Sequence, residues 1–409
     1  MNMWNEPNYV HIDDTIDDIQ SMDKRYIAPT YGRAPICFVK GIGSYVYGTD
    51  GKEYIDLGSG IGVTSFGIAD PVWEEAVVNQ VKALNHVSNL YYTAPQAMLA
   101  KALCEKTGMS SVFFSNSGAE ANECAIKGAR KYSFDKYGDG RGTIITLENS
   151  FHGRTITTLS ATGQDVFHQY FGPFTEGFVH TPANDIEALY ALAERQDICA
   201  IMMEMIQGEG GVMPLQPEFV KAATTLAAEK DWLVIVDEVQ TGNGRTGTMY
   251  AYEQFHIQPH IVSTAKGLAG GLPMGATLFN ETVASVWGVG DHGSTFGGNP
   301  ICAAGALTVV NRIDSELLQE VQEKGRFIKD SLIGAPGVIS VDGLGLMVGI
   351  GITGDAKKVQ QACLEQGVIV LTAKDKIRLL PALTIPMEAL QKGLEIVKGA
   401  VTECGFTAF

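Results

Sequence analysis

From about residue 110 onward, short apolar runs alternate with helical patterns along the chain. Seven runs show no polar alternation: residues 112–114, 143–147, 177–179, 200–203, 232–236, 261–262 and 275–278. Runs of this kind are typical of strands that are buried on both faces of a parallel sheet. Their alternation with helical patterns predicts βαβ units, and therefore a mostly parallel sheet with helices on both faces.

The pattern differs on either side of this region. Residues 45–47 and 54–57 flank an Asp-Gly turn and predict a β-hairpin. Pro71 begins a helical pattern that extends to Leu84. One apolar face is expected on this helix, formed by Val72, Ala76, Val77, Val81 and Leu84.

Both ends of the chain carry weaker signals. Residues 1 to about 28 are acidic and predict a short helix or an unstructured lead. After Pro300 we expect one long helix through residues 316–330. Short strands then alternate with helices, at residues 350–352, 368–370 and 377–379, which indicates a smaller α+β domain.

Composition narrows the class of protein. The chain has 409 residues, 45% of them hydrophobic and 19% charged, which is typical of a globular protein with two or three domains. Its net charge of -16 argues against nucleic acid and anionic membranes as partners. The seven cysteines are scattered, the acidic N-terminus lacks the features of a signal peptide, and the chain has no long apolar stretch. We therefore predict a reduced, cytoplasmic protein.

Two polar residues follow apolar runs that we expect to be neighbouring strands. Asp237 ends the 232–236 run, and Lys266 lies shortly after the 261–262 run. If the strands pair, both side chains face the crevice where open α/β sheets bind ligands. An acid and an amine held apart by one flat ring fit pyridoxal phosphate, which needs a lysine and an acid for its ring nitrogen. A salt bridge between strand ends is the alternative. These two residues alone do not distinguish this salt bridge from a cofactor site.

Small residues lie where the first strand of this region passes into a helix. Ser117, Gly118 and Ala119 follow residues 112–114 and begin a helix that extends to about Tyr132. Free backbone N–H groups at such a helix start can bind phosphate. A serine N-cap with a Glu120 capping box is the alternative. The stretch lacks the GK[ST] ending of a P-loop.

Other candidate ligand contacts are distributed along the chain. Phe151, in a loop after a strand, can stack on a flat cofactor, and Arg154 offers a planar fork for a carboxylate. An ordinary loop with a surface ion pair is the alternative for this pair. The hydroxyls of Ser294 and Thr295 can reach a phosphate. Arg378 is a lone base on an apolar strand and needs an anionic partner, either a ligand carboxylate or a structural acid.

Two other site types are disfavoured. Residues 242–247 and 288–293 match G-x-G-x-x-G, but neither is followed by the expected helix, and the first has no acid about 20 residues on. A nicotinamide-dependent dehydrogenase is therefore the weaker alternative. His256 and His260 have a spacing found in zinc sites, but Pro259 interrupts the helix, so we predict no metal site.

Taken together, these motifs resemble the class III, subgroup II, pyridoxal-phosphate aminotransferases of fold type I. The resemblance covers nearly the whole chain, through LGSGIGV (57–63), HVSNLYY (86–92), SNSGAEANE (115–123), FHGRT (151–155), QGEGG (207–211), DEVQTGNGRTG (237–247), AKGLAGGLP (265–273), STFGGNP (294–300) and RLLP (378–381). It implies an α/β fold, in which a large domain holds a mostly parallel seven-stranded sheet beside a smaller α+β domain. The implied parts are an N-terminal segment that packs with the small domain (1–65), a large cofactor-binding domain (66–310) and a C-terminal small domain (311–409).

The resemblance also implies roles for matching residues. Lys266 carries pyridoxal 5'-phosphate, and Asp237 pairs with its ring nitrogen. Residues 117–119 hold the phosphate, joined by Thr295 from the partner subunit of a homodimer with shared active sites. The remaining implied contacts are Phe151, His152, Glu238, Val239 and Gln240 for the cofactor, and Arg154, Glu209, Ser294 and Arg378 for the substrate.

Within this family the resemblance implies transfer of the terminal amino group of N-acetylornithine to 2-oxoglutarate, forming glutamate, in arginine biosynthesis. The alternatives are succinylornithine, ornithine or 4-aminobutyrate transamination and glutamate-1-semialdehyde isomerisation; a non-enzymatic binding protein is more remote. Three departures from the family pattern occur: residues 66–71 lack two usual histidines, and Met205 and Ala382 replace prolines. None of them removes a catalytic group.

Overall fold

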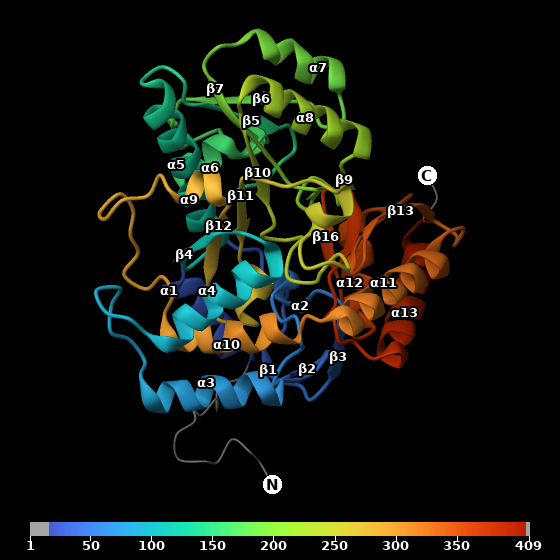
Figure 1. Cartoon of the computed structure of the whole chain (residues 1–409). Coiled ribbons are helices and arrows are strands. Elements are labelled where there is room, and N and C mark those ends of the chain that lie inside the picture. The colour runs from blue at the N-terminus through green and yellow to red at the C-terminus, as the bar shows by residue number, and fades with distance from the viewer. Residues whose placement is uncertain (1–15, 406–409) are drawn as a thin grey trace.

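A computed structural model describes residues 16–405 of the chain, so part of the acidic lead lies outside the described residues. Its centre is a seven-stranded sheet in the order β4-β12-β11-β10-β7-β5-β6 (Figure 1). Only β12 is antiparallel to its neighbours. The strands are β4 (Ser111–Ser115), β5 (Thr143–Leu147), β6 (Phe178–Thr181), β7 (Ile198–Met203), β10 (Leu233–Asp237), β11 (Ile261–Thr264) and β12 (Gly275–Phe279). Each overlaps one of the seven apolar runs, so the predicted sheet is confirmed.

Both faces of this sheet are buried, which explains why its strands are apolar without alternation. On one face, Ile235 of β10 belongs to the same cluster as Ile126 of α5 (Gly118–Tyr137). On the other face, Val236 belongs to a larger cluster with Phe219 of α8 (Pro217–Lys230). The other helices of this region are α3 (Pro71–Ala83), α4 (Ala94–Thr107), α6 (Ile156–Ala161), α7 (Ile186–Ala191), α9 (Glu281–Ala284) and α10 (Pro300–Arg312).

Smaller sheets join the two ends of the chain. The predicted hairpin is confirmed as β2 (Tyr45–Gly48) and β3 (Glu53–Asp56), which follow β1 (Phe38–Ile42). β15 (Val368–Ile369) pairs in parallel with β3, so the C-terminal part completes an N-terminal sheet. A second sheet has the order β13-β14-β17-β16. Its elements and the nearby helices are β13 (Val338–Leu344), β14 (Met347–Ile352), β16 (Leu371–Ala373), β17 (Lys376–Leu379), α11 (Ser315–Leu332), α12 (Ala356–Glu365) and α13 (Met387–Gly405).

The prediction of one long helix after Pro300 is wrong. The chain forms α10 and α11 as separate helices, because Asp314 adopts an extended conformation between them. The carboxylate of Asp314 accepts a hydrogen bond from the backbone N–H of Leu317 at 2.9 Å. Such a side-chain cap satisfies a free N–H group and begins a new helix. The apolar periodicity on either side did not reveal it.

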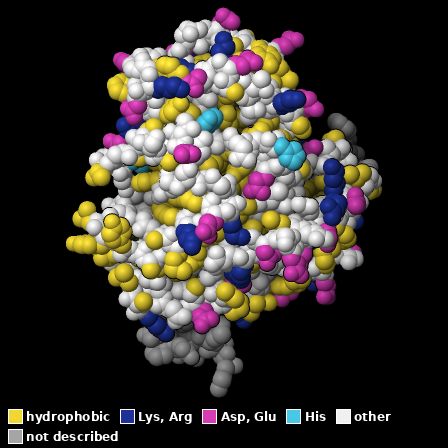
Figure 2. Space-filling view, in the orientation of Figure 1, with side chains coloured by type: hydrophobic (Ala, Val, Ile, Leu, Met, Phe, Trp, Pro, Cys, Tyr) yellow, Lys and Arg dark blue, Asp and Glu magenta, His cyan; other side chains and the backbone are white. Residues whose placement is uncertain are grey.

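The helix predicted from Pro71 is confirmed as α3, but its expected apolar face is not buried within one chain. Val72 and Val81 are 49% and 52% exposed, respectively. α3 instead contacts the core through Trp73, whose indole N–H donates to the carbonyl of Ala269 at 2.9 Å. Figure 2 shows hydrophobic side chains spread over the face that carries α3, α4 and α10.

The remaining elements are short. Between residues 16 and 405 no helix combines the length and the apolar character needed to span a membrane. The acidic lead forms a helix, α1, within the described residues. The short elements are α1 (Ile16–Tyr26), α2 (Ser59–Gly62), β8 (Ile206–Gln207), β9 (Met213–Pro214), and the 3-10 helices η2 (Asp165–Phe167), η3 (Leu192–Glu194), η4 (Ala251–Phe255) and η5 (Lys266–Ala269).

Candidate active site

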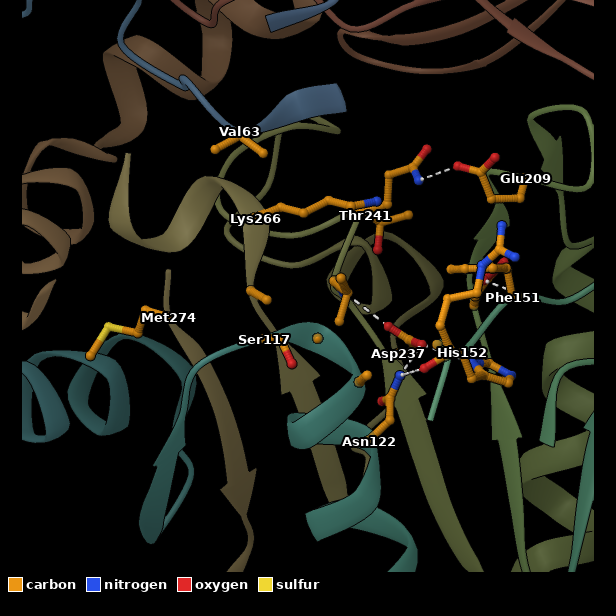
Figure 3. Close-up of a pocket in the computed structure, with 18 of the residues that line it drawn as sticks. Val63, Ser117, Asn122, Phe151, His152, Glu209, Asp237, Thr241, Lys266 and Met274 are labelled. Atoms are coloured by element: carbon orange, nitrogen blue, oxygen red, sulfur yellow. Dashed lines mark hydrogen bonds and ion pairs between the residues drawn. The ribbon is translucent and has the colours of Figure 1, made fainter. Parts of the chain in front are cut away.

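A cavity of about 450 Å³ lies at the carboxyl ends of β7, β10 and β11 and at the start of α5 (Figure 3). Parallel pairing of β10 with β11 places Asp237 opposite Ser263, three residues before Lys266. The fold therefore brings Asp237 and Lys266 to one crevice, as expected from the two strands. The predicted residues that line it are Ser117, Gly118, Ala119, Phe151, His152, Arg154, Glu209, Asp237, Val239, Gln240 and Lys266.

Asp237 lies on the cavity wall and is only 3% exposed. Its Oδ2 accepts a hydrogen bond from Asn122 Nδ2 at 2.7 Å. The Nδ1 of His152 lies 2.8 Å from the same oxygen, which requires Nδ1 to carry the proton. The Oδ1 of Asp237 accepts from the backbone N–H of Val239 at 3.0 Å. These three contacts hold the carboxylate in one orientation.

Lys266 is the first residue of η5 and has a φ of 46°. This value lies in the left-handed region of the backbone, which is unfavourable for residues other than glycine. The pKa of its amine is lowered to about 8, chiefly by burial and also by the charge of Arg378, against the opposing charges of Glu209 and Asp237. About a tenth of this amine is therefore neutral at pH 7, and a nucleophile or general base needs this neutral form.

The start of α5 has the serine N-cap of the alternative interpretation but not its capping box, because Glu120 Oε2 accepts from the backbone N–H of Asn116 at 2.7 Å. Ser117 is the N-cap, and its hydroxyl accepts from the backbone N–H of Glu120 at 3.2 Å. The same first turn also lines the cavity. A Cβ atom at Gly118 would lie 2.6 Å from Val239 Cγ1, so only glycine allows this close approach. The helix start can therefore be capped and still present backbone N–H groups to an anion.

Two arginines have different surroundings. Arg378 is buried, and its Nη1 donates to Glu209 Oε1 at 2.6 Å and to Gln240 Oε1 at 3.0 Å. Burial alone would raise the pKa of Glu209, but the charge and hydrogen bond of Arg378 outweigh this and lower it. The anionic partner that the sequence required for Arg378 is, in this structure, the carboxylate of Glu209.

Arg154 is exposed and lines the cavity. Among the residues that the structure describes, no polar group pairs with it. Its guanidinium carbon instead lies 4.2 Å from the ring centroid of Phe167 and 5.4 Å from that of Phe151. Its N–H donors therefore remain available to an incoming carboxylate.

Arg378 does not line the cavity of a single chain, and neither do three other predicted residues. Glu238 points away from it, accepts hydrogen bonds from Thr241 Oγ1 and the backbone N–H of Tyr252, and has its pKa raised by burial to about 7. Ser294 Oγ accepts from Asn116 Nδ2 at 3.1 Å, beside the start of α5. Thr295 lines a separate small hollow.

Two buried polar residues of the site were missed in the sequence. Asn122 lies in the SNSGAEANE motif and donates to Asp237, whereas Glu204 directly follows β7 at the cavity wall. Burial, followed by the charge of Asp237, raises the pKa of Glu204 well above its usual value. Side-chain oxygen or nitrogen atoms of Glu204, His152 and Asp237 that could bind a metal ion lie within 4.8 Å of one another. A position after a buried strand was the available signal for Glu204, as it was for Asp237.

Comparison with known proteins shows that the chain is similar to aminotransferases over most of its length. Residues 26–401 match the model of the family described as aminotransferase class-III. An acetylornithine aminotransferase of Haemophilus ducreyi is 51% identical over 95% of this chain and 100% of that protein. An acetylornithine aminotransferase of Caldanaerobacter subterraneus is 43% identical over 94% of this chain and 99% of that protein.

Solved structures of related proteins have the same fold. An ornithine aminotransferase from Toxoplasma gondii has a TM-score of 0.90 at 30% identity, covering 95% of this chain and 96% of that chain. A second structure of that enzyme, with a TM-score of 0.89 at 30% identity over 95% of both chains, has PLP at partial occupancy in its active site. An N-acetylornithine aminotransferase from Stenotrophomonas maltophilia has a TM-score of 0.81 at 33% identity, covering 94% and 98% of the two chains.

Proposed function

The chain belongs to the class-III aminotransferases, which use pyridoxal phosphate, and from that premise we propose that it transfers the terminal amino group of N-acetylornithine to 2-oxoglutarate. The ion pair between Arg378 and Glu209 is the observation that supports a donor reacting at its terminal amine, and the acetylornithine aminotransferases among the relatives support N-acetylornithine as that donor. A donor that reacts at its terminal amine has no carboxylate next to the reacting carbon. Glu209 supplies that missing negative charge to Arg378, which would otherwise be buried and unpaired.

The residues of the cavity fit pyridoxal phosphate. Residues 117–119, at the start of α5, line the cavity, where backbone N–H groups can bind a phosphate. Asp237 accepts three hydrogen bonds and can accept about one more, because a carboxylate offers about four acceptor sites. The buried amine of Lys266, with its lowered pKa, suits reaction with an aldehyde. When bound, the cofactor supplies a ring that withdraws electrons from the substrate carbon.

Each surrounding residue has a proposed task toward this group. Asp237 would hold the proton on the ring nitrogen, with His152 and Asn122 keeping its carboxylate in place. Lys266 Nζ would accept the proton from the substrate carbon and donate it to the reacting carbon of the cofactor. Ser117 and the N–H groups of α5 would bind the phosphate, and Phe151 would stack on the ring with Val239 and Gln240 beside it.

The two arginines would each bind a different carboxylate of the substrates. Arg154 would bind the carboxylate far from the reacting carbon in both N-acetylornithine and glutamate. Arg378 would bind the α-carboxylate of glutamate, and Glu209 would then leave it. One cavity would thus accept two donors that react at different carbon positions.

A cytoplasmic homodimer with shared active sites completes the proposal. Thr295 lies in a separate hollow of one chain, so its hydroxyl would reach the phosphate of the partner's site. The exposed apolar side chains support such an association: Leu90 is 86% exposed, and Val72 and Val81 are exposed on α3. Burying this surface would stabilise a dimer.

A panel of amino donors with 2-oxoglutarate tests the function. N-acetylornithine should give the highest kcat/KM against N-succinylornithine, ornithine and 4-aminobutyrate, with ping-pong kinetics because the amino group waits on the enzyme. Borohydride should attach the cofactor at Lys266, identified by peptide mass. A higher kcat/KM for another donor would overturn the proposed substrate. Conversion of glutamate-1-semialdehyde without 2-oxoglutarate would assign an aminomutase instead.

A further inference from the structure

The surroundings of Arg154 contain an aromatic residue that lies outside all of the family motifs in the sequence. Phe167 ends η2, and its ring centroid lies 4.2 Å from the guanidinium carbon of Arg154. The rings of Phe167 and Phe151 also meet edge to face, with centroids 5.8 Å apart and planes at 72°. Phe167 thus contacts the side chains of both Arg154 and Phe151, which line the cavity.

Hydrogen bonds join the segment that carries Phe167 to the strand end that leads to Phe151. The backbone N–H of Asn149 donates to the carbonyl of Gly163 at 2.7 Å. The backbone N–H of Gly163 donates to Ser150 Oγ at 3.0 Å, and Gln164 Nε2 donates to the carbonyl of Ser150 at 2.9 Å. A Cβ atom at Gly163 would lie 2.2 Å from the carbonyl oxygen of Leu147. The two segments are therefore held in close register.

An aromatic face can restrain an arginine without using its hydrogen-bond donors. The ring contacts the face of the guanidinium through stacking and cation–π attraction, while the N–H groups lie in the guanidinium plane. For Arg154, no polar partner competes among the described residues. A restrained but unpaired arginine loses less side-chain freedom when it binds a carboxylate.

We propose that Phe167 is a positioning residue for Arg154, which it holds in the orientation that binds the distal carboxylate of the substrate. This inference rests on the proposed function for the role of Arg154. Phe167 does not line the cavity itself, so its effect passes through Arg154 and Phe151. Loss of its ring should weaken the binding of substrates that carry a distal carboxylate and leave the proton transfers at Lys266 unchanged.

Rapid mixing of the holoenzyme in its amino form with a 2-oxo acid separates the effect on substrate binding from the effect on proton transfer. In Phe167→Leu, the apparent Kd for 2-oxoglutarate should rise about fivefold, within the range of a cation–π contact, while the limiting rate stays within about twofold. Pyruvate has the same reacting group but no distal carboxylate, so its weak reaction should not change. Phe167→Tyr keeps the ring and should behave like the wild type.

Two controls test whether the effect passes through Arg154. Phe171→Leu removes an exposed aromatic ring from the same segment, and it should leave the Kd for 2-oxoglutarate unchanged. In an Arg154→Gln background, Phe167→Leu should add little further loss, because the group that it positions is gone. If Phe167→Leu does not fold, Phe167→Met serves in both backgrounds.

Other outcomes would overturn the inference. An unchanged Kd for 2-oxoglutarate in Phe167→Leu would exclude a positioning role. Equal weakening of pyruvate and 2-oxoglutarate, or an undiminished effect in the Arg154→Gln background, would indicate a general structural role instead. Because this half-reaction uses only 2-oxo acids, a failure of N-acetylornithine as donor would refute the proposed substrate and leave this test intact.

Discussion

At the scale of single residues, burial controls the reactivity of Lys266. Its pKa is lowered from 10.5 to about 8, so the neutral amine predominates above about pH 8. The rate at which the cofactor-free protein binds pyridoxal phosphate covalently should therefore rise with pH, reach half of its maximum near pH 8 and level off about one unit higher. Stopped-flow absorbance with borohydride trapping measures this rate, and Lys266→Ala provides the control without covalent uptake. A rate that still rises steeply near pH 10 would contradict the lowered pKa.

The pair of Arg378 and Glu209 leads to opposite effects of two substitutions. Glu209→Gln removes the charge that Arg378 needs while N-acetylornithine reacts, so that half-reaction should slow at least about tenfold and the glutamate half-reaction much less. Arg378→Lys should impair the glutamate half-reaction more, because an ammonium group cannot form the two parallel hydrogen bonds of a guanidinium. Rapid mixing of each variant with each donor measures both. Similar losses in the two half-reactions would refute the exchange of partners.

At the scale of secondary structure, the ends of the elements assemble the site. β10 ends at Asp237, η5 begins at Lys266, and α5 begins directly after its N-cap Ser117. These ends meet because neighbouring parallel strands finish at the same edge of the sheet. A change that shifts the register of β10 against β11 would therefore move Asp237 relative to Lys266.

The start of α11 depends on one side chain. Asp314→Ala removes the acceptor for the N–H of Leu317 and should lower the free energy of unfolding by about 1 kcal/mol. Urea denaturation at a fixed protein concentration measures this change. Asp330→Ala, which removes an acid near the other end of the same helix, should cause no comparable loss. A loss below about 0.3 kcal/mol in Asp314→Ala would show that the cap contributes little.

At the scale of the whole molecule, shared active sites can be tested with hybrid dimers. If Thr295 serves the partner's site, a dimer of one Lys266→Ala chain and one Thr295→Ala chain contains one intact site. Random mixing makes about half of the dimers hybrid, so about a quarter of the wild-type activity should return at limiting cofactor.

The control for this experiment is a chain that carries both substitutions, mixed with either single variant. No combination then contains an intact site under the shared arrangement, so activity should stay at the level of the parents. Recovery should also require conditions that allow chains to exchange. If the two single variants do not complement each other, Thr295 acts within its own chain or contributes little.

Much of this protein was determined by its sequence alone. Strands buried on both faces must be apolar throughout, so the seven strands of the central sheet were recognisable before their partners were known. Asp237 and Lys266 were noticeable because each lies at or shortly after the end of such a run, where open α/β sheets bind ligands. The family motifs extended this to the cofactor and to the class of reaction, which the comparisons bear out.

Only the tertiary structure decided which distant residues meet. It showed β12 antiparallel within the sheet and β15 joined to the N-terminal sheet, since pairing depends on chain direction and not on local apolar pattern. It also revealed Phe167 over Arg154, which are separated along the chain by 13 residues. Such contacts arise from packing in three dimensions, so no periodicity in the sequence records them.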